Sequence, residues 1–330
     1  MRSLERFLTN IFNVTKRPSP PGTESMPTPG TKRPSPPGPL SRWERGRRFY
    51  QTLNSDWIGG VLKKGVGLLD EETQAELRAW VNSQQNEAGG FSDRGGACDL
   101  YYTLFGFFLA DALEMERVMS RLKVYVKNIA KDESVMGINL FCAAILHSSL
   151  FPDDPETGKF IRRIRKIKDG DGTFNGEYSR FLVVLSLIYL RDHLGAWKAL
   201  KAFGRANSSK DRQENERGRP CPVVAAALIL AFIKSGFKIG DASQIMAFYQ
   251  GNGGFAALAD APAPDLLSTA VALFALQFLG YDMCLIRPDC MEFVETLYQN
   301  GGFRGSPQDD YVDVEYTFYG LLALGAVDEK

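Results

Sequence analysis

Carboxylates gather where the sequence predicts that apolar helices begin, and such groups could do three kinds of chemistry. Asp309-Asp310-Tyr311-Val312-Asp313 spells D-D-x-x-D, a pattern whose hard oxygen ligands suit magnesium and diphosphate. Glu315 follows two residues later, and a carboxyl group with a raised pKa could donate a proton to an alkene. Two carboxylates about 5–9 Å apart across a cavity could instead hydrolyse a glycosidic bond. The candidates for that role are Asp309, Asp310, Asp313 and Glu315.

A purely structural role competes with each of these. Asp99, Asp265 and Asp313 each precede an apolar run, and an Asp at that position caps a helix by accepting hydrogen bonds from its free amides. The same Asp recurs, whereas a site residue need not recur. Capping is therefore the favoured interpretation, and retained pocket residues are the alternative. The D-D-x-x-D pattern is expected in a loop that enters a helix, which favours a chance match.

These Asp residues belong to an internal repeat. A Gly-Gly-Phe segment is followed by Asp and then by an apolar helix. The three clearest copies are Gly89-Gly90-Phe91 with Asp99, Gly253-Gly254-Phe255 with Asp265, and Gly301-Gly302-Phe303 with Asp313. A weaker copy is Gly170-Asp171-Gly172-Thr173-Phe174. The paired glycines let the chain reverse, and the Phe after them is predicted to plug between neighbouring helices.

The repeat pairs two kinds of helix. Apolar helices are predicted at 99–113, 135–150, 178–193, 222–235, 265–279 and 313–326. Helices that are apolar almost all round must be buried on most sides. Amphipathic helices are predicted near 70–83, 115–130, 156–168, 195–205, 240–250 and 288–299. An apolar ring inside an amphipathic ring predicts an all-α fold, an α6/α6 barrel or toroid of six helix-pair repeats.

Composition excludes several classes of protein. The chain has 330 residues with a net charge of zero, which gives no indication of nucleic-acid binding. No apolar run reaches about 18 residues, so no membrane span is predicted. The five cysteines show no C-x-x-C spacing, which predicts free thiols and a cytoplasmic location.

The first 45 residues differ from the remainder. Thr15-Lys16-Arg17-Pro18-Ser19-Pro20-Pro21-Gly22 is repeated at 31–38, and the stretch is rich in Pro, Ser and Gly. It resembles translated repetitive DNA of the kind found between bacterial genes. Such a composition predicts a disordered tail over 1–45 and a toroid domain over 46–330.

The repeat resembles that of the prenyltransferase and squalene-cyclase toroid superfamily. The closest resemblance is to the β subunit of Rab (type II) geranylgeranyltransferase. The segments that carry it are Gly89-Gly90-Phe91-Ser92-Asp93-Arg94, Asp99-Leu100-Tyr101-Tyr102-Thr103, and Gly176-Glu177-Tyr178-Ser179-Arg180-Phe181, with Gln85, Gln250 and Gln299 before the glycines. The resemblance covers residues 60 to 330 and implies a transferase that acts on isoprenoid substrates.

The same resemblance implies a zinc site that this chain has lost. The family holds catalytic zinc with an Asp, a Cys two residues later and a distant His, and the metal makes a thiolate nucleophile. Here the Asp is Asp265, the Cys position holds Leu267, and the His position holds Tyr316. No zinc or other cofactor is therefore expected.

The phosphate-binding side is also depleted. The family places Lys and Arg just before the Asp-x-Cys, whereas residues 256–264 here contain no basic residue. Arg180 and the N-termini of the inner helices remain for binding anions. A basic run, Arg162, Arg163, Arg165, Lys166 and Lys168, falls on an outer helix and is interpreted as a solvated face.

The ligand site is predicted at one mouth of the barrel. Its residues are Asp99, Tyr102, Arg180, Asp265, Asp313 and Tyr316, with Asp265 and Asp313 as the catalytic candidates. Below them lie Phe105, Phe107, Phe108, Phe141, Phe181, Phe274, Phe318 and Tyr319, which either pack the core or line an apolar cavity.

Three functions stay open at this point. The first is a prenyltransferase-like protein that binds an isoprenoid-like or other apolar ligand without zinc-dependent thiol prenylation. The second is a non-catalytic scaffold or interaction protein. The third is a metal-independent terpenoid cyclase or a carbohydrate-active α6/α6 enzyme. A helical partner subunit is implied by the resemblance to the Rab enzyme, but the sequence does not identify one.

Overall fold

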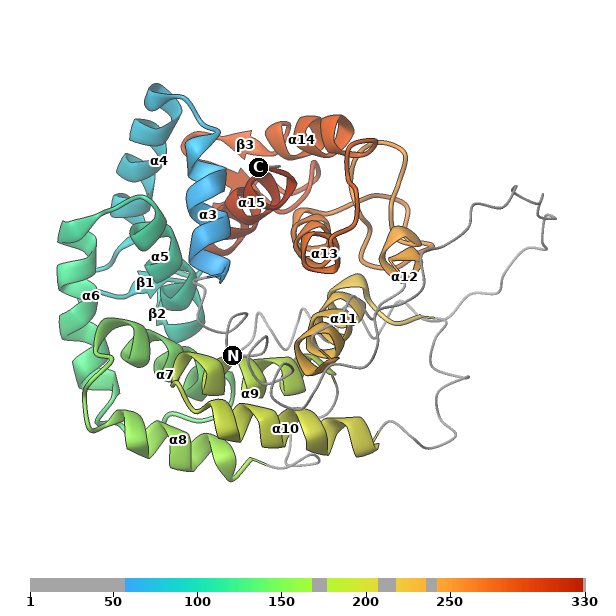
Figure 1. The fold of residues 1–330 in the computed structure, drawn as a ribbon. Helices are drawn as coiled ribbons and strands as arrows, with labels where there is room; N and C mark the ends of the chain where they lie inside the picture. The colour runs from blue at the N-terminus through green and yellow to red at the C-terminus, as the bar shows by residue number, and fades with distance from the viewer. Residues whose placement is uncertain (1–56, 168–176, 207–217, 236–241, 329–330) are drawn as a thin grey trace.

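Apolar helices form a closed inner ring in the computed structural model, which describes residues 57–167, 177–206, 218–235 and 242–328 (Figure 1). In ring order these are α5 (Leu100–Ala112), α7 (Ile138–Leu150), α9 (Glu177–Tyr189), α11 (Cys221–Ser235), α13 (Leu266–Leu279) and α15 (Val314–Val327). Each packs against the next, and α15 closes the ring by packing against α5. These are the helices that the sequence predicts to be apolar all round.

A second ring surrounds the first (Figure 1). Its members are α4 (Glu71–Gln84), α6 (Glu116–Ile129), α8 (Thr157–Arg165), α10 (His193–Ala206), α12 (Ser243–Met246) and α14 (Arg287–Glu295). The predicted all-α toroid of helix pairs is thus confirmed. The predicted tail over 1–45 and the weak repeat at 170–174 lie outside the described residues.

Two elements differ from the prediction. The outer helix predicted near 240–250 is only the single turn α12, because the chain leaves it to form the bridge between Tyr249 and Phe255. An additional helix, α3 (Trp57–Gly67), was not predicted, since its sequence contains four glycines and glycine has low helix propensity. It packs against α15 and α5.

Short strands carry the Gly-Gly-Phe segments. β1 (Phe91–Ser92) pairs with β2 (Cys98–Asp99), and β4 (Gly302–Arg304) pairs with β3 (Tyr298–Gln299) and β5 (Val312–Asp313). In each clear repeat the Phe stands opposite the Asp, as Phe91 and Asp99 do. The hairpin therefore fixes where the following inner helix begins.

A threonine completes each repeat. The backbone amide of Phe91 donates to Thr103 Oγ1 (2.9 Å), and the Thr103 hydroxyl donates to the carbonyl of Asp99 (2.6 Å). The same pair of bonds links Phe255, Thr269 and Asp265, and Phe303 donates in the same way to Thr317. These bonds satisfy backbone groups that would otherwise be buried without a partner.

The Phe side chains plug the layer between the rings, as predicted. Phe91, Phe255 and Phe303 are fully buried. Phe91 and Phe303 lie on Gly106 and Gly320 of the following inner helices, where a Cβ would overlap the ring. These glycines are therefore required by packing.

The cysteines and the apolar helices bear on two expectations drawn from the composition. None of the five cysteines, all of which are among the described residues, forms a disulfide bond, and Cys98 and Cys284 are exposed. Within the described ranges, no helix is both long enough and apolar enough to cross a membrane.

Helix α3 crosses α15 at backbone contact. A Cβ added at Gly65 would overlap the carbonyl oxygen of Leu321, and one at Gly325 would overlap that of Val61. Gly60, on the same helix, has no heavy atom within 4 Å of such a Cβ. Only glycine therefore permits the crossing.

We predict that Gly65→Ala lowers the free energy of unfolding by roughly 1–3 kcal/mol, because α3 and α15 must separate to admit the methyl group. Gly60→Ala is the matched control, and it should be neutral or stabilising by about 0.5–1 kcal/mol because alanine favours the helix. Urea unfolding of both variants tests this. Equal effects at the two positions would contradict the close crossing.

Candidate functional site

Three Asp residues mark the same end of neighbouring inner helices. Asp99, Asp265 and Asp313 are the N-caps of α5, α13 and α15, and each side chain accepts hydrogen bonds from the first-turn amides. The capping interpretation is confirmed. The amide of Leu266 donates to the carbonyl of Gly305 (2.8 Å), which ties the start of α13 to the loop before α15.

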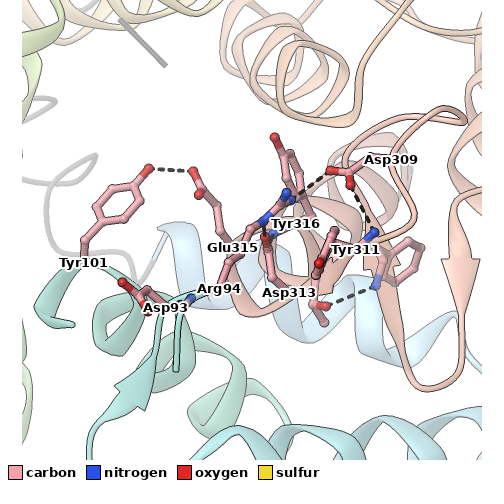
Figure 2. Close-up of polar contacts among 11 residues, drawn as sticks. Asp93, Arg94, Tyr101, Asp309, Tyr311, Asp313, Glu315 and Tyr316 are labelled. Carbon is pink, nitrogen blue, oxygen red and sulfur yellow. Dashed lines mark hydrogen bonds and ion pairs between the residues drawn. The ribbon is translucent and has the colours of Figure 1, made fainter. Parts of the chain in front are cut away.

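Arg94 joins the first repeat to the last at this end (Figure 2). Its Nε donates to Asp313 Oδ2 (2.6 Å) and its Nη2 to Asp309 Oδ2 (2.9 Å). The guanidinium lies over the rings of Tyr316 (5.3 Å to the centroid) and Tyr311 (5.5 Å). We call Arg94, Asp309 and Asp313 the clasp.

A tight turn presents Arg94 to the clasp. Asp93 Oδ1 accepts hydrogen bonds from the amides of Gly95 (2.9 Å) and Ala97 (3.0 Å), which closes the loop between β1 and β2. Asp side chains favour such turns because they bond to backbone amides a few residues further on. The loop thereby holds Arg94 toward the last repeat.

Tyr316 is held from two sides. The Arg94 guanidinium lies over one part of the ring, and Gly305 lies against it, since a Cβ there would come within 2.5 Å of Tyr316 Cζ. Burial raises the pKa of Tyr316, and the charges of Glu315 and Asp313 raise it further. Its hydroxyl is therefore neutral at physiological pH.

Glu315 meets Tyr101 across the junction of α15 and α5. The Tyr101 hydroxyl donates to Glu315 Oε1 (2.6 Å), as Figure 2 shows. Burial raises the pKa of Glu315 from 4.5 to about 8, and the negative charge of Asp313 adds to this. A carboxyl group of this kind carries a proton near neutral pH.

The other carboxyl groups have different electrostatic surroundings. Burial raises the pKa of Asp313, although the Tyr316 amide and Arg94 partly offset it. Burial also raises the pKa of Asp265 to about 6, against hydrogen bonds from the first turn of α13. Burial alone would lower the pKa of Arg94, but Asp313 and Asp309 raise it above its ordinary value.

An aromatic cluster begins at Tyr101 and continues away from Glu315. Tyr101 meets Phe105 edge-on at 4.8 Å, Phe105 lies 4.9 Å from Phe318, and Phe318 lies 5.7 Å from Phe108. Phe108 in turn contacts Tyr189 of α9 at 6.1 Å. The aromatic side chains of the inner ring thus form a connected series below the carboxyl groups.

The structure gathers several of the predicted site residues. Asp313 and Tyr316 meet at Arg94, and the charge of Asp313 acts on the buried hydroxyl of Tyr102. The charges of Asp99 and Asp265 act on Glu315 and on Tyr316. Arg180 is in the first turn of α9, three positions round the ring from α15.

Sequence reasoning missed Arg94 and Tyr101 as site residues. Both contacts join residues more than 210 positions apart, Arg94 to Asp313 and Tyr101 to Glu315. The predicted barrel could have indicated these contacts, because a closed ring places the first repeat beside the last.

The residues that the resemblance assigns to the zinc position do not fit the metal. Leu267 has no donor atom, and the Tyr316 ring lies between Arg94 and Gly305. Asp265 caps α13 by accepting from the Ser268 amide (2.8 Å). Cys221 is buried, and burial raises the pKa of its thiol, with a contribution from Asp265. The described residues contain no group of three or more His, Cys, Asp or Glu arranged to hold a metal ion.

Comparison with known proteins identifies the repeat. Residues 55–123 and 115–329 match the family model described as the prenyltransferase alpha-alpha toroid domain. The match covers most of the chain. No curated protein sequence gives a significant match.

We predict that Glu315→Gln changes how stability depends on pH. The folded-state pKa of Glu315 lies above its ordinary value of 4.5, so the stabilisation by its proton is complete below about pH 4.5 and is lost as pH rises through about 8. Between about pH 5 and pH 9, the free energy of unfolding of the wild type should fall by roughly 2–4 kcal/mol relative to that of Glu315→Gln. This range is smaller than the full pKa shift would give, because Glu315 is partly exposed to solvent.

Chemical unfolding across this pH range provides the measurement. Glu292→Gln is the control, because Glu292 is exposed on α14. It should follow the wild type at every pH. Parallel pH profiles for the wild type and Glu315→Gln would show that Glu315 is ionised throughout.

Proposed function

This chain belongs to the family of prenyltransferase alpha-alpha toroid domains, and from that membership we propose that it binds an isoprenoid-like, largely apolar ligand. We propose further that it does so without zinc-dependent thiol prenylation. The observation that carries the proposal is the composition of the barrel mouth. Its one clasp arginine is already paired with two carboxylates, and the position of the zinc thiolate is an apolar leucine.

The charge at the mouth argues against a tightly held diphosphate. Arg94 is paired with Asp309 and Asp313, while Asp99 acts on the neighbouring Glu315 and Asp265 on Tyr316. Five carboxyl groups therefore belong to this end of the barrel. The inner-helix N-termini would attract an anion, but each of the three named Asp caps already uses those amides. An uncharged head group, such as an alcohol, suits this mouth better than a diphosphate.

The aromatic series supports the apolar part of the ligand. Tyr101, Phe105, Phe108, Phe318 and Tyr319 come from two adjacent inner helices and contact one another. Ligand sites are lined mainly by apolar and aromatic side chains with a few polar groups that fix orientation. Here the hydroxyl of Tyr101 and the carboxyl of Glu315 would supply the polar contacts.

A second candidate function rests on Glu315. A protonated carboxyl group beside an aromatic series can start cyclisation of an alkene, as a metal-independent terpenoid cyclase would. The Glu315 O–H bond breaks, the alkene π electrons form a new C–H bond, and the adjacent carbon becomes a cation that the aromatic faces stabilise. The π electrons of a second alkene in the same molecule then form the ring-closing C–C bond to this cation. Loss of a proton from the cyclised cation to water restores an alkene, and the Glu315 carboxylate regains a proton from water, which balances the reaction.

Ligand binding provides the first test. We expect a fluorescent geranylgeraniol analogue to bind with micromolar affinity and its diphosphate to bind at least about tenfold more weakly, because the mouth repels the anion. Arg180→Ala should leave alcohol binding unchanged. If the diphosphate binds with micromolar affinity or better, and Arg180→Ala abolishes this binding, the site has retained a diphosphate-binding arginine. If neither compound binds, the scaffold function is favoured.

The same samples separate binding from catalysis. The cyclase candidate requires that the wild type convert the bound alkene and that Glu315→Gln bind it without converting it. An unchanged alkene in the wild type would leave ligand binding as the function.

Metal content provides the second test. We predict that elemental analysis of the purified wild type finds no stoichiometric zinc, because a leucine and a clamped tyrosine replace the thiolate and imidazole. About one zinc per chain, lost in Asp265→Asn or Asp313→Asn, would contradict this and would identify a substitute ligand set.

A further inference from the structure

Every charged side chain within α8 and α10 is basic. Arg162, Arg165 and Lys166 are exposed on or just after α8, and Lys198 and Lys201 are exposed on α10. The sequences of Thr157–Arg165 and His193–Ala206 contain no acidic residue. Solvent-exposed helix faces usually carry both positive and negative side chains. The basic residues of α8 and α10 depart from that pattern.

The two helices form one continuous surface. Arg165, near the end of α8, donates through Nε to Asp192 Oδ2 (2.6 Å), just before α10. Asp192 also accepts from the amide of Gly195, and its carboxylate is buried. The Asp192 carboxylate is thus enclosed and paired. Figure 1 shows α8 and α10 side by side at the lower rim.

Several of these cations have no counter-charge. Arg162, Lys166 and Lys198, together with the exposed Arg191 just before α10, form no ion pair with another described residue. Lys159 is paired with Glu156 and Arg165 with Asp192. The uncompensated field therefore points outward.

The other outer helices differ. α4 carries Glu71, Glu72 and Glu76, and α14 carries Asp289, Glu292 and Glu295. On α6, which carries Glu116, Arg121 donates to the carbonyl of Asn86 and Lys127 lies over the ring of Phe151. Unlike α4, α6 and α14, α8 and α10 thus contain basic residues and no acidic ones.

An exposed leucine lies within the basic face. Leu194 is 60% exposed, and Lys198 and Lys201 follow it by four and seven residues, on the same side of the helix. Lys201 lies over the ring of Trp197. Leucine and tryptophan among lysines and arginines are typical of a surface that lies in the interface of a bilayer.

We propose that the face formed by Arg162, Lys166, Arg191, Leu194, Lys198 and Lys201 docks the protein on an anionic lipid surface. The cations meet the lipid head groups, and Leu194 enters the acyl boundary. Each Lys or Arg near such a surface contributes about 1 kcal/mol, a factor of about five in partitioning. The leucine favours a bilayer over an acidic protein, because a purely electrostatic partner gives it no apolar surface to bury. This docking needs no ligand in the barrel and is independent of the proposed function.

Co-sedimentation of the full chain with vesicles tests the proposal. The wild type should bind vesicles of phosphatidylcholine mixed with phosphatidylglycerol, should not bind phosphatidylcholine alone, and should be released by high salt. Arg162→Glu with Lys198→Glu should reduce partitioning by at least about 25-fold, since two such contributions are lost. Arg117→Glu with Lys123→Glu is the matched control, because it changes one exposed Arg and one exposed Lys on α6. It should reduce partitioning by less than about fivefold.

The apolar contact has its own matched pair. Leu194→Ala should weaken binding several-fold, whereas Leu285→Ala should not, although Leu285 is 92% exposed. Every variant keeps residues 1–56, so basic side chains there are common to all. Circular dichroism melting checks that each variant folds.

Three outcomes would overturn the proposal. The wild type fails to bind the anionic vesicles. The α6 control loses as much binding as the α8–α10 variant, which would reduce the effect to net charge. Soluble polyglutamate binds more tightly than the vesicles and is lost in the α8–α10 variant, which would assign the face to an acidic protein.

Discussion

The fold depends on closing a ring of helices that are apolar on nearly every side. An open row would expose the apolar faces of its two terminal helices to water, so α15 must return to α5. Two contacts make the closure specific. The clasp joins Arg94 to Asp309 and Asp313 at the capped ends, and α3 crosses α15 where Gly65 and Gly325 permit backbone contact. The clasp is an electrostatic contact that is partly exposed, whereas the α3–α15 crossing depends on close packing of buried backbone. The two contacts therefore stabilise the closed ring by different physical means.

Closure also creates the electrostatics of the barrel mouth. Arg94 pairs directly with Asp313, whose pKa burial raises, whereas Glu315 accepts a hydrogen bond from the neutral hydroxyl of Tyr101. Two carboxyl groups two residues apart therefore have different surroundings, one paired with a cation and the other raised to a pKa of about 8. Such a separation of environments distinguishes acids from bases in many active sites. Here the two environments arise at the junction between the last repeat and the first. Each carboxyl group is on α15 or caps it, while its partner belongs to the first repeat.

The sequence predicted the fold better than the site, for a physical reason. Local periodicity and hydrogen bonds within one repeat, such as that from Phe91 to Thr103, determine the inner helices, their caps and the buried Phe residues. The internal sequence repeat therefore predicts these features. Arg94 and Tyr101 act only across the closed seam, where no spacing rule applies. α3 escaped prediction because its glycines, which lower helix propensity, are needed for packing against α15. Asp99, Asp265 and Asp313 were found because they recur, and they recur because they cap.

The proposed loss of the zinc site would involve more than the two positions that the resemblance assigns to its ligands. Tyr316 occupies more space than a histidine, and its ring fits because residue 305 is glycine and because Arg94 lies over it. Arg94 in turn places a fixed cation on Asp313, next to where a divalent metal would add its own charge. Restoring Cys at 267 and His at 316 would therefore leave an arginine competing for the same negative field. Arg94, Tyr316 and Gly305 form a packed set, because the guanidinium lies over the Tyr316 ring and the ring lies against Gly305.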